Sequence, residues 1–444
     1  EGMKHLWQLL GGRVSHTIGL NLMARNTTYA LLQLQNAVRI LPPESVAAIN
    51  VGNEPDSLGY RHPAEFGTDY LKRSTKGWLA DQLMFMKVLA PTLQQWLGTT
   101  RVFSGPAAAN SKEFPSSMVS KWAQLGSSNK GPGPYAKIVT MHHYVMNAKR
   151  NAAQATVENL LAESKSVIAH TMVTSYSKAA AKQGLIYRTD ETNSISSQGT
   201  YDVSDTLAAA LWTIDNSLVT LQSGGSGVNY HSVGCATYNM VFFPGFCGAA
   251  DQIDPNSPKF QKECPNTCGQ ANAPAIPSAP YFGMWFTQQA LSESNELKIL
   301  PVEAALVLSR TDVKMFVLRN LSDVRVVLIN RANSPAEPTE VSFTVTGHAD
   351  WGPATAWRLL STNGTLSARV ETISFGGQAI NLQTGQREGR VVTETYQPTP
   401  SVQGKTYTVS MPPASAALLV VRDQSLVSAV KCLEVDSFTS PSPH

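Results

Sequence analysis

Two glutamates in this chain follow short apolar stretches and stand among polar residues. Glu54 lies in Asn53-Glu54-Pro55, directly after the apolar residues 47–51, and Glu191 lies in the segment 184–194. Proline cannot donate to a strand ladder and restricts the residue before it, so the first stretch is predicted to be a strand that ends at Glu54. Taken alone, a glutamate before proline is more often an N-cap or a surface turn acid.

Taken together, the two carboxylates indicate a particular chemistry. Glu54 and Glu191 are 137 residues apart (191 − 54 = 137), so only a fold that gathers strand ends can bring them together. A ring of parallel strands does this, because its catalytic groups lie at one face. Two carboxylates on either side of a sugar can hydrolyse a glycosidic bond. One protonates the leaving oxygen, and the other attacks the anomeric carbon or activates water.

Longer strings around these residues resemble a known family. Asn53-Glu54-Pro55 and the segment 190–193 resemble the acid/base and nucleophile motifs of the clan A glycoside hydrolases. The strings VGNEPD at 51–56 and ETNS at 191–194, with HHY at 142–144 between them, resemble glycoside hydrolase family 79, the β-glucuronidase and heparanase-like family. The resemblance covers most of the chain.

The resemblance implies a mechanism and its main residues. Glu54 would be the general acid/base and Glu191 the nucleophile of a retaining hydrolase, with carboxyl groups about 5–5.5 Å apart. Asn53 resembles the asparagine that binds the sugar 2-hydroxyl, although a turn-capping role is the alternative. The substrate would be a β-glucuronide or a glucuronate-containing glycan. No metal and no organic cofactor are implied.

Further substrate-binding residues are expected at later strand ends. Tyr144 resembles the residue that orients the nucleophile. Side chains alternate along a strand, so His142 and His143 must point in opposite directions. We expect one of them to be a core residue and His143 to line the cleft. Tyr230 and His231 end the last strand of the alternating region and are expected to face the sugar, with packing as the alternative.

One loop departs from the family pattern, and the identity of the substrate sugar is therefore not decided by the motifs. Related glucuronidases commonly carry an aromatic residue and a glycine after the nucleophile, and these help to hold the substrate carboxylate. Here residues 194–199 read SISSQG, without an aromatic residue. Serine and amide groups can hydrogen-bond a carboxylate or a neutral sugar. A clan A enzyme for neutral sugars is therefore an alternative.

The order of predicted elements indicates an α/β fold with a TIM-type (β/α)8 barrel. We predict six strands, ending near residues 21, 54, 105, 144, 191 and 231, with helical segments between them. In clan A enzymes the acid/base follows the fourth strand and the nucleophile the seventh, so the first two strands are expected to be missing. This leaves open a catalytically inactive, carbohydrate-binding protein.

Two domains are expected in this chain of 444 residues. Residues 1–296 form the partial barrel. Residues 297–444 contain short alternating segments, at 314–318, 325–329, 341–345, 406–409 and 416–421, which predict an antiparallel β-sandwich. The net charge of +3 does not favour a nucleic-acid partner, and no apolar run reaches the length of a membrane span.

Cysteine spacing predicts disulfides and secretion. Four of the five cysteines cluster in one loop region and the fifth lies near the C-terminus; they are Cys235, Cys247, Cys264, Cys268 and Cys432. A zinc site at Cys264 and Cys268 is the alternative. The sequons at Asn26, Asn320 and Asn363 are consistent with a secreted glycoprotein. The first residues do not resemble a signal peptide.

Overall fold

The computed structural model describes residues 2–70, 77–127, 131, 133–149, 152–233, 236–242, 275–292, 297–300, 312–333, 335–346 and 350–425. Contacts group the chain into two compact units. The first contains Glu1–Tyr144, Val167–Thr192 and Ser223–Tyr230, and the second contains Val145–Ser166, Asn193–Gln222 and His231–His444. The predicted domain bounds of 1–296 and 297–444 stay a prediction. All five cysteines lie outside the described residues, and so do their predicted disulfides.

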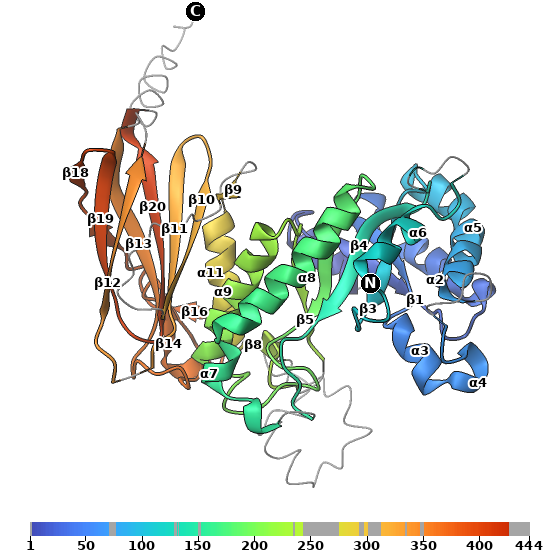
Figure 1. Ribbon diagram of the computed structural model, residues 1–444, viewed down its shortest axis with the longest axis horizontal. Helices are drawn as coiled ribbons and strands as arrows, with labels where there is room; N and C mark the ends of the chain where they lie inside the picture. The colour runs from blue at the N-terminus through green and yellow to red at the C-terminus, as the bar shows by residue number, and fades with distance from the viewer. Residues whose placement is uncertain are drawn as a thin grey trace, which may run out of the picture. The chain divides into compact units, whose positions relative to one another are not determined.

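The first unit is built on one parallel sheet (Figure 1). Its six strands lie in chain order, each paired in parallel with the next: β1 (His16–Leu20), β2 (Val46–Val51), β3 (Phe103–Ala108), β4 (Ala136–His143), β5 (Ile186–Thr192) and β6 (Val228–Tyr230). All six predicted strands are present. Two strands, β3 and β4, separate the strands of Glu54 and Glu191, as the resemblance requires. Among the described residues this curled sheet of six strands is a half-barrel of the TIM type.

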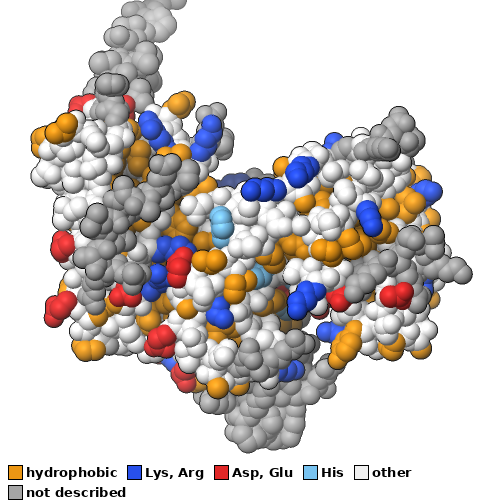
Figure 2. Space-filling view, viewed as in Figure 1, with side chains coloured by type: hydrophobic (Ala, Val, Ile, Leu, Met, Phe, Trp, Pro, Cys, Tyr) orange, Lys and Arg blue, Asp and Glu red, His pale blue; other side chains and the backbone are white. Residues whose placement is uncertain are grey.

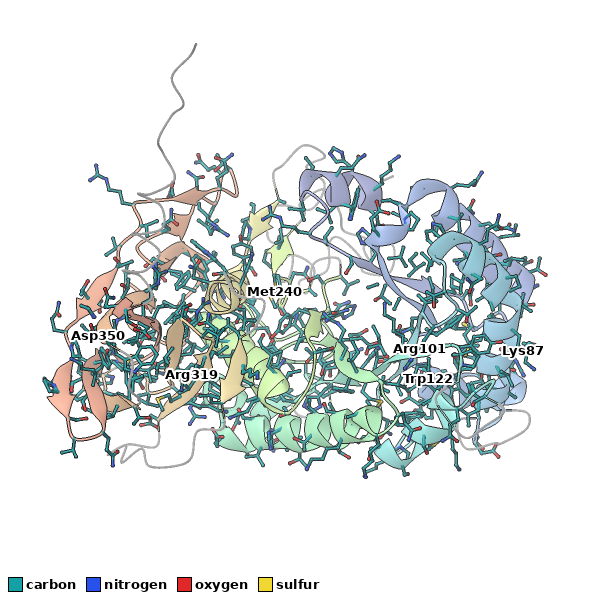
Figure 3. The ribbon with its side chains drawn as sticks, turned by 90° about the horizontal axis from the view of Figure 1, so that it is seen from above. Lys87, Arg101, Trp122, Met240, Arg319 and Asp350 are labelled. Atoms are coloured by element: carbon teal, nitrogen blue, oxygen red, sulfur yellow. The ribbon has the colours of Figure 1, made fainter. Side chains whose placement is uncertain are left out.

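Helices connect the strands of this sheet. They are α1 (Gly2–Leu9), α2 (Thr27–Ile40), α3 (Pro55–Arg61), α4 (Pro63–Phe66), α5 (Trp78–Leu97), α6 (Val119–Ala123) and α8 (Glu163–Ala181), with short 3-10 turns at Pro43–Ser45 and Ser116–Met118. The sheet packs on α5 through buried apolar residues, among them Trp78, Phe85 and Phe103. Trp122, labelled in Figure 3, is fully buried in the same core. Parallel strands buried in this way leave only their ends for polar side chains.

The second unit contains the predicted β-sandwich. One sheet has the order β14 (Ile373–Phe375), β13 (Trp351–Ser361), β20 (Ser415–Asp423), β11 (Asp323–Asn330), β10 (Val313–Arg319) and β9 (Lys298–Leu300), with β17 (Glu394–Tyr396) also paired to β13. The other contains β12 (Thr339–Thr346), β19 (Gly404–Met411) and β18 (Thr399–Ser401). Burial alternates residue by residue along β12, as a half-buried strand requires. The predicted fold class, a TIM-type barrel with a C-terminal β-sandwich, is confirmed.

The remaining elements of the second unit are mostly helical. They are α7 (Val157–Leu160), α9 (Leu207–Gln222), α11 (Ala279–Leu291), the 3-10 turns Ala152–Gln154 and Val370–Thr372, and the short strand pairs β7 (Val241–Phe242) with β8 (Ile276–Pro277) and β15 (Ala379–Ile380) with β16 (Arg387–Glu388). Helix α9 is buried along most of its length and packs closely on α11. A Cβ atom on Gly283 of α11 would lie 2.3 Å from the carbonyl oxygen of Ala210 in α9. Glycine therefore sets how closely these helices approach.

Two features are relevant to nucleic-acid and membrane partners: the distribution of basic side chains on the surface, and the length and hydrophobicity of the helices. Figure 2 shows basic side chains spread over the face in view, without one broad basic patch. Within the described part of the chain, no helix is both long and apolar enough to cross a membrane.

Candidate active site

Glu54 has an unusual backbone conformation at the end of β2. Its φ of 45° and ψ of 57° lie in the left-handed region, which costs a non-glycine residue of order 1 kcal/mol. Contacts on both sides hold this conformation. The Glu54 N–H donates to the carbonyl of Ala107 at 2.9 Å, and the Glu54 carbonyl accepts from the Ser57 N–H and hydroxyl at 2.8 and 2.7 Å. Strain maintained in this way is common at functional sites.

Glu191 is the next-to-last residue of β5, and Tyr144 follows the end of β4. The Tyr144 hydroxyl donates to Glu191 Oε1 at 3.0 Å. The side chain of Glu191 is 18% exposed. Oε1 is thus held by a phenol, and Oε2 lies 3.6 Å from His142 Nδ1. The orienting role of Tyr144 stays a prediction, and this hydrogen bond is the contact on which it would depend.

His142 lies between the two glutamates. Its Nδ1 is 3.2 Å from Glu54 Oε1 and 3.6 Å from Glu191 Oε2, and its side chain is 2% exposed. The imidazole nitrogen and one oxygen from each glutamate lie within 4.8 Å of one another. The carboxylate oxygens are therefore nearer the separation of retaining glycosidases, about 5–5.5 Å, than that of inverting enzymes, about 6.5–9.5 Å.

A β-bulge brings Asp190 to the same place as Glu191. Met141 pairs with Thr189 and His142 pairs with Glu191, so Asp190 is the extra residue on β5. A bulge re-aims side chains, and this allows two consecutive carboxylates to line one cavity. Asp190 Oδ1 lies 3.9 Å from His142 Nε2. Thr140 hydrogen-bonds to the Asp190 carboxylate, and its hydroxyl accepts from the Ala107 N–H at 3.1 Å.

Burial and charge shift the titration of these groups. Burial lowers the pKa of His142, but the hydrogen bond to Glu54 and the charges of Asp190 and Glu191 raise it, and the net pKa is above the ordinary value. Burial raises the pKa of Asp190, opposed by His142 and Thr140. Burial also raises the pKa of Asp56, which follows Glu54 by two residues. Each of these three side chains, His142, Asp190 and Asp56, therefore has a pKa above its ordinary value.

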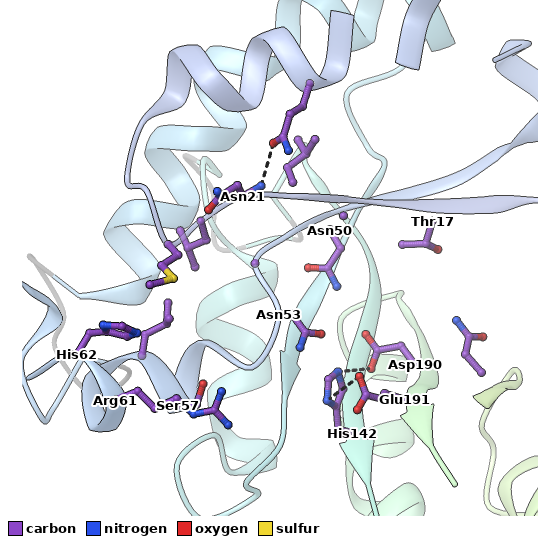
Figure 4. Close-up of a pocket in the computed structure, with 18 residues that line it drawn as sticks. Thr17, Asn21, Asn50, Asn53, Ser57, Arg61, His62, His142, Asp190 and Glu191 are labelled. Carbon is purple, nitrogen blue, oxygen red and sulfur yellow. Dashed lines mark hydrogen bonds and ion pairs between the residues drawn. The ribbon is translucent and has the colours of Figure 1, made fainter. Parts of the chain in front are cut away.

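A cavity of about 620 Å³ opens beside these groups (Figure 4). Its lining is rich in amide and hydroxyl side chains and has few cations; it contains Thr17, Asn21, Gln33, Asn50, Asn53, Ser57, Arg61, His62, His142, Asp190, Glu191 and Asn229. Glu54 is not part of this lining. Its carboxylate is 22% exposed and contacts His142, and Arg61 Nη2 lies 3.9 Å from Glu54 Oε2. Amides and hydroxyls are the groups that hydrogen-bond sugar hydroxyls.

The structure differs from the sequence prediction at the histidine pair. His142, and not His143, lines the cavity. Burial lowers the pKa of His143 to about 4, and its Nε2 is buried with no hydrogen-bond partner among the described residues. Because Tyr144 was expected to face the site, strand alternation applied from Tyr144 would have selected His142, two residues away. His142 is therefore the histidine that lines this cavity, and a substrate contact by His143 stays a prediction.

The other residues predicted to bind substrate differ in their positions relative to the cavity. Asn53 lines the cavity, and its contact with a sugar hydroxyl stays a prediction. Tyr230 is the last residue of β6 and is not part of the lining, whereas its neighbour Asn229 is. His231 belongs to the second unit, where its Nδ1 is 2.8 Å from the Tyr238 hydroxyl and its carbonyl accepts from Asn193. Sugar contacts by Tyr230 and His231 stay predictions.

Several lining residues were not selected from the sequence. Asn21 and Asn50 belong to the β1 and β2 region, Asn229 to β6, and Arg61 ends α3. Isolated asparagines carry little signal, because they are common in turns and caps. Arg61 is seven residues after Glu54, and only the short helix α3 brings its guanidinium back toward that carboxylate.

Comparisons with known proteins find structures but no sequence relatives. No family model and no curated protein matches the chain. A solved structure of a 4-O-α-L-rhamnosyl-β-D-glucuronidase from Fusarium oxysporum is similar with a TM-score of 0.67 and 18% identity, covering 94% of this chain and 79% of that one.

Two further solved structures are similar over most of the chain. A family 44 xyloglucanase from Paenibacillus polymyxa has a TM-score of 0.53 and 9% identity, covering 89% of this chain and 70% of that one. An α-L-arabinofuranosidase from Thermotoga maritima has a TM-score of 0.51 and 11% identity, with coverages of 91% and 75%. At these identities the likeness shows a shared fold, that of glycoside hydrolases with TIM-type barrels.

Proposed function

We propose that this protein is a retaining glycoside hydrolase that uses Glu54 and Glu191. The observation that carries the proposal is the approach of the two glutamates. Their carboxylates come from the ends of β2 and β5, within 4.8 Å of each other and of His142, beside a cavity lined by amides and hydroxyls. The fold that the chain shares with known glycosidases supports the proposal.

In the first step Glu191 attacks the sugar. An oxygen lone pair of Glu191 forms a bond to the anomeric carbon, and the glycosidic C–O bond breaks with its electron pair going to the leaving oxygen. Glu54 transfers its proton to that oxygen. The hydrogen bond from Tyr144 to Oε1 leaves Oε2 of Glu191 to act as the nucleophile. Negative charge thereby moves from Glu191 to Glu54.

In the second step water releases the sugar. Glu54, now ionised, removes a proton from water as the water oxygen attacks the anomeric carbon. The ester bond to Glu191 breaks, and its electron pair returns to the Glu191 carboxylate. Both glutamates recover their starting protonation states. The product keeps the anomeric configuration of the substrate because the configuration is inverted twice.

The substrate that we propose is a β-glucuronide or a glucuronate-containing glycan. Support comes from the family 79-like motifs and from the similar structure that is named a glucuronidase. Arg61 and His62 line the cavity and supply basic groups for a carboxylate. The amide-rich remainder of the lining favours a neutral sugar just as well, and the loop 194–199 lacks an aromatic residue. A neutral-sugar glycosidase is therefore the second candidate.

A panel of chromogenic substrates tests the proposal. The purified chain is assayed with 4-nitrophenyl β-glucuronide, β-glucoside and β-xyloside, and with 4-nitrophenyl α-L-arabinofuranoside. Turnover of the glucuronide, lost in Glu191→Gln, is the expected result. Turnover of only a neutral glycoside would retain the mechanism and reject the substrate. Binding of oligosaccharide without turnover of any glycoside would instead identify a carbohydrate-binding protein and reject the enzyme.

Secretion and N-glycosylation belong to the same proposal. Asn26 caps α2 by accepting from the Thr28 and Tyr29 N–H groups, and Asn363 is exposed. A glycan on either side chain would be attached at the amide nitrogen and would leave the capping oxygen available. Expression in a eukaryotic secretory host, followed by treatment with an N-glycosidase, should reduce the mass of the protein. An unchanged mass would reject glycosylation.

A further inference from the structure

The cluster of Glu54, His142 and Glu191 has the composition of a metal site. It offers one imidazole nitrogen and two carboxylate oxygens, all within 4.8 Å of one another, from three different strand ends. Imidazole and carboxylate together suit Zn²⁺, which takes nitrogen and oxygen ligands in a tetrahedron. Mg²⁺ prefers oxygen ligands and octahedral geometry, and it is much less suited to this set.

The distances between the ligand atoms are close to those that zinc requires. A tetrahedral ion with bonds of about 2.0–2.1 Å separates its ligand atoms by about 3.3 Å. His142 Nδ1 lies 3.2 Å from Glu54 Oε1 and 3.6 Å from Glu191 Oε2. The third separation, between the carboxylate oxygens, is at most 4.8 Å, and rotation of the two partly exposed glutamate side chains would bring it to the value that zinc requires. The cavity beside Glu191 supplies space for water in the fourth position.

A second polar or charged group lies near each of the three side chains. The Tyr144 hydroxyl donates to Glu191 Oε1 at 3.0 Å, and Arg61 Nη2 lies 3.9 Å from Glu54 Oε2. Behind His142, Asp190 Oδ1 is 3.9 Å from Nε2, and this oxygen is buried with no hydrogen-bond partner among the described residues. A carboxylate behind the second imidazole nitrogen is the usual outer contact of a metal-binding histidine.

We propose that these three side chains bind one Zn²⁺ ion, through His142 Nδ1, Glu54 Oε1 and Glu191 Oε2, and that the ion blocks the site. Binding is independent of the proposed function, whereas inhibition rests on it. A coordinated Glu54 cannot hold the proton that it must donate, and a coordinated Glu191 has its attacking oxygen occupied. Zinc and substrate therefore exclude each other, and the metal-free protein is the active form.

Isothermal titration calorimetry tests the binding directly. The full chain is treated with EDTA and dialysed, its free thiols are blocked with iodoacetamide so that cysteines do not compete, and ZnCl₂ is titrated into it. The expected result is one site per chain, with affinity reduced by about 100-fold or more in His142→Gln. His170→Gln, which alters an exposed histidine bonded to Ser223, is the matched control and should bind zinc as wild type does. MgCl₂ should give no saturable binding.

Three outcomes would overturn the site. They are the absence of zinc binding, equal zinc affinity in wild type and His142→Gln, and equal loss of affinity in His170→Gln. Glu191→Gln, which keeps the shape of the side chain, provides a second variant if His142→Gln does not fold by circular dichroism. It should also lose about 100-fold in affinity, and unchanged affinity would contradict the proposed ligand set.

The activity assay separates this proposal from the proposed function. If wild type hydrolyses a glycoside of the panel, zinc should raise the apparent KM without changing kcat, and EDTA should restore the original KM. Inhibition that lowers kcat alone would show that zinc does not exclude substrate, and this would reject the blocking role. If no glycoside is hydrolysed, the proposed function fails, and the calorimetric titration still decides the zinc site.

Discussion

Tyr144 and Glu191 are joined by a hydrogen bond of 3.0 Å from the phenol to Oε1 of the carboxylate. A hydrogen bond to a charged group contributes about 1.5–3 kcal/mol, so its loss should reduce the rate about 10- to 100-fold. Tyr144→Phe is expected to lower kcat for the best glycoside by this factor, with the chain still folded. Steady-state kinetics measure it. An unchanged kcat would show that Tyr144 does not orient the nucleophile.

If Glu54 is the acid/base, an external nucleophile that needs no general base should restore turnover to a variant that lacks this carboxylate. In Glu54→Ala, a dinitrophenyl glycoside can still form the intermediate, because its leaving group needs no proton. Without a general base, water hydrolyses this intermediate slowly, and kcat should fall about 10²- to 10⁴-fold. Added azide should accelerate turnover and yield a β-glycosyl azide, identified by mass spectrometry.

The control for this prediction is Glu65→Ala, which removes an exposed carboxylate of α4. It should hydrolyse the dinitrophenyl glycoside at the wild-type rate and gain nothing from azide. A Glu54→Ala enzyme that hydrolyses glycosides normally would remove Glu54 from the acid/base role.

Alkaline stability should depend on Tyr407 in the β-sandwich. Its hydroxyl donates to the Gly352 carbonyl at 2.7 Å, and burial raises its pKa to about 12 from 10.0. The unfolded chain ionises this phenol near pH 10, whereas the folded chain does not, so stability that is present below pH 10 is lost as the pH rises toward 12. Tyr407→Phe should be about 1 kcal/mol less stable at pH 7, with a smaller difference above pH 10.

Denaturant unfolding at pH 7, 9, 10 and 11 measures this difference. Other tyrosines titrate in both proteins, so the comparison isolates Tyr407. A difference between the two proteins that stays constant over this range would contradict the raised pKa.

Gly283 should be intolerant of a side chain. A Cβ atom at this position would lie 2.3 Å from the Ala210 carbonyl and 2.7 Å from Thr213 Cβ, so α11 would have to move away from α9. Gly283→Ala is expected to reduce the free energy of unfolding by about 1–3 kcal/mol. Gly2→Ala in α1, where nothing lies within 4 Å, should not be destabilising. Equal stabilities of the two variants by chemical denaturation would refute the packing argument.

The strands and the sandwich were predictable because their signals are local. Mostly apolar stretches such as 48–51 and 138–141 are largely buried in the sheet, and polar residues follow each of them. Alternating segments such as 341–345 show their burial pattern in the sequence itself. The positions of Glu54 and Glu191 at strand ends followed from the same signals. Their approach followed from the topology of a barrel.

Strand alternation from Tyr144 could have selected His142 as the cavity-facing histidine, but its contacts with the two glutamates were not predictable in the same way. Its contacts with Glu54 and Glu191 depend on side chains from three strands. The bulge at Asp190 is set by the pairing of β4 with β5, and no residue type in the sequence marks it. The left-handed conformation of Glu54 likewise depends on the Ala107 carbonyl, from β3. The geometry between strands therefore had to come from the structure.

The most direct test of the two-glutamate account is the configuration of the first product. The β-glycoside that is hydrolysed fastest is followed by proton NMR from the first seconds, before the sugar mutarotates. One carboxylate oxygen of Glu54 and one of Glu191 lie within 4.8 Å of each other, near the carboxyl separation of about 5–5.5 Å in a double displacement. We predict that the β-anomer appears first and the α-anomer later. Initial release of the α-anomer would show a single displacement by water and would contradict the role assigned to Glu191.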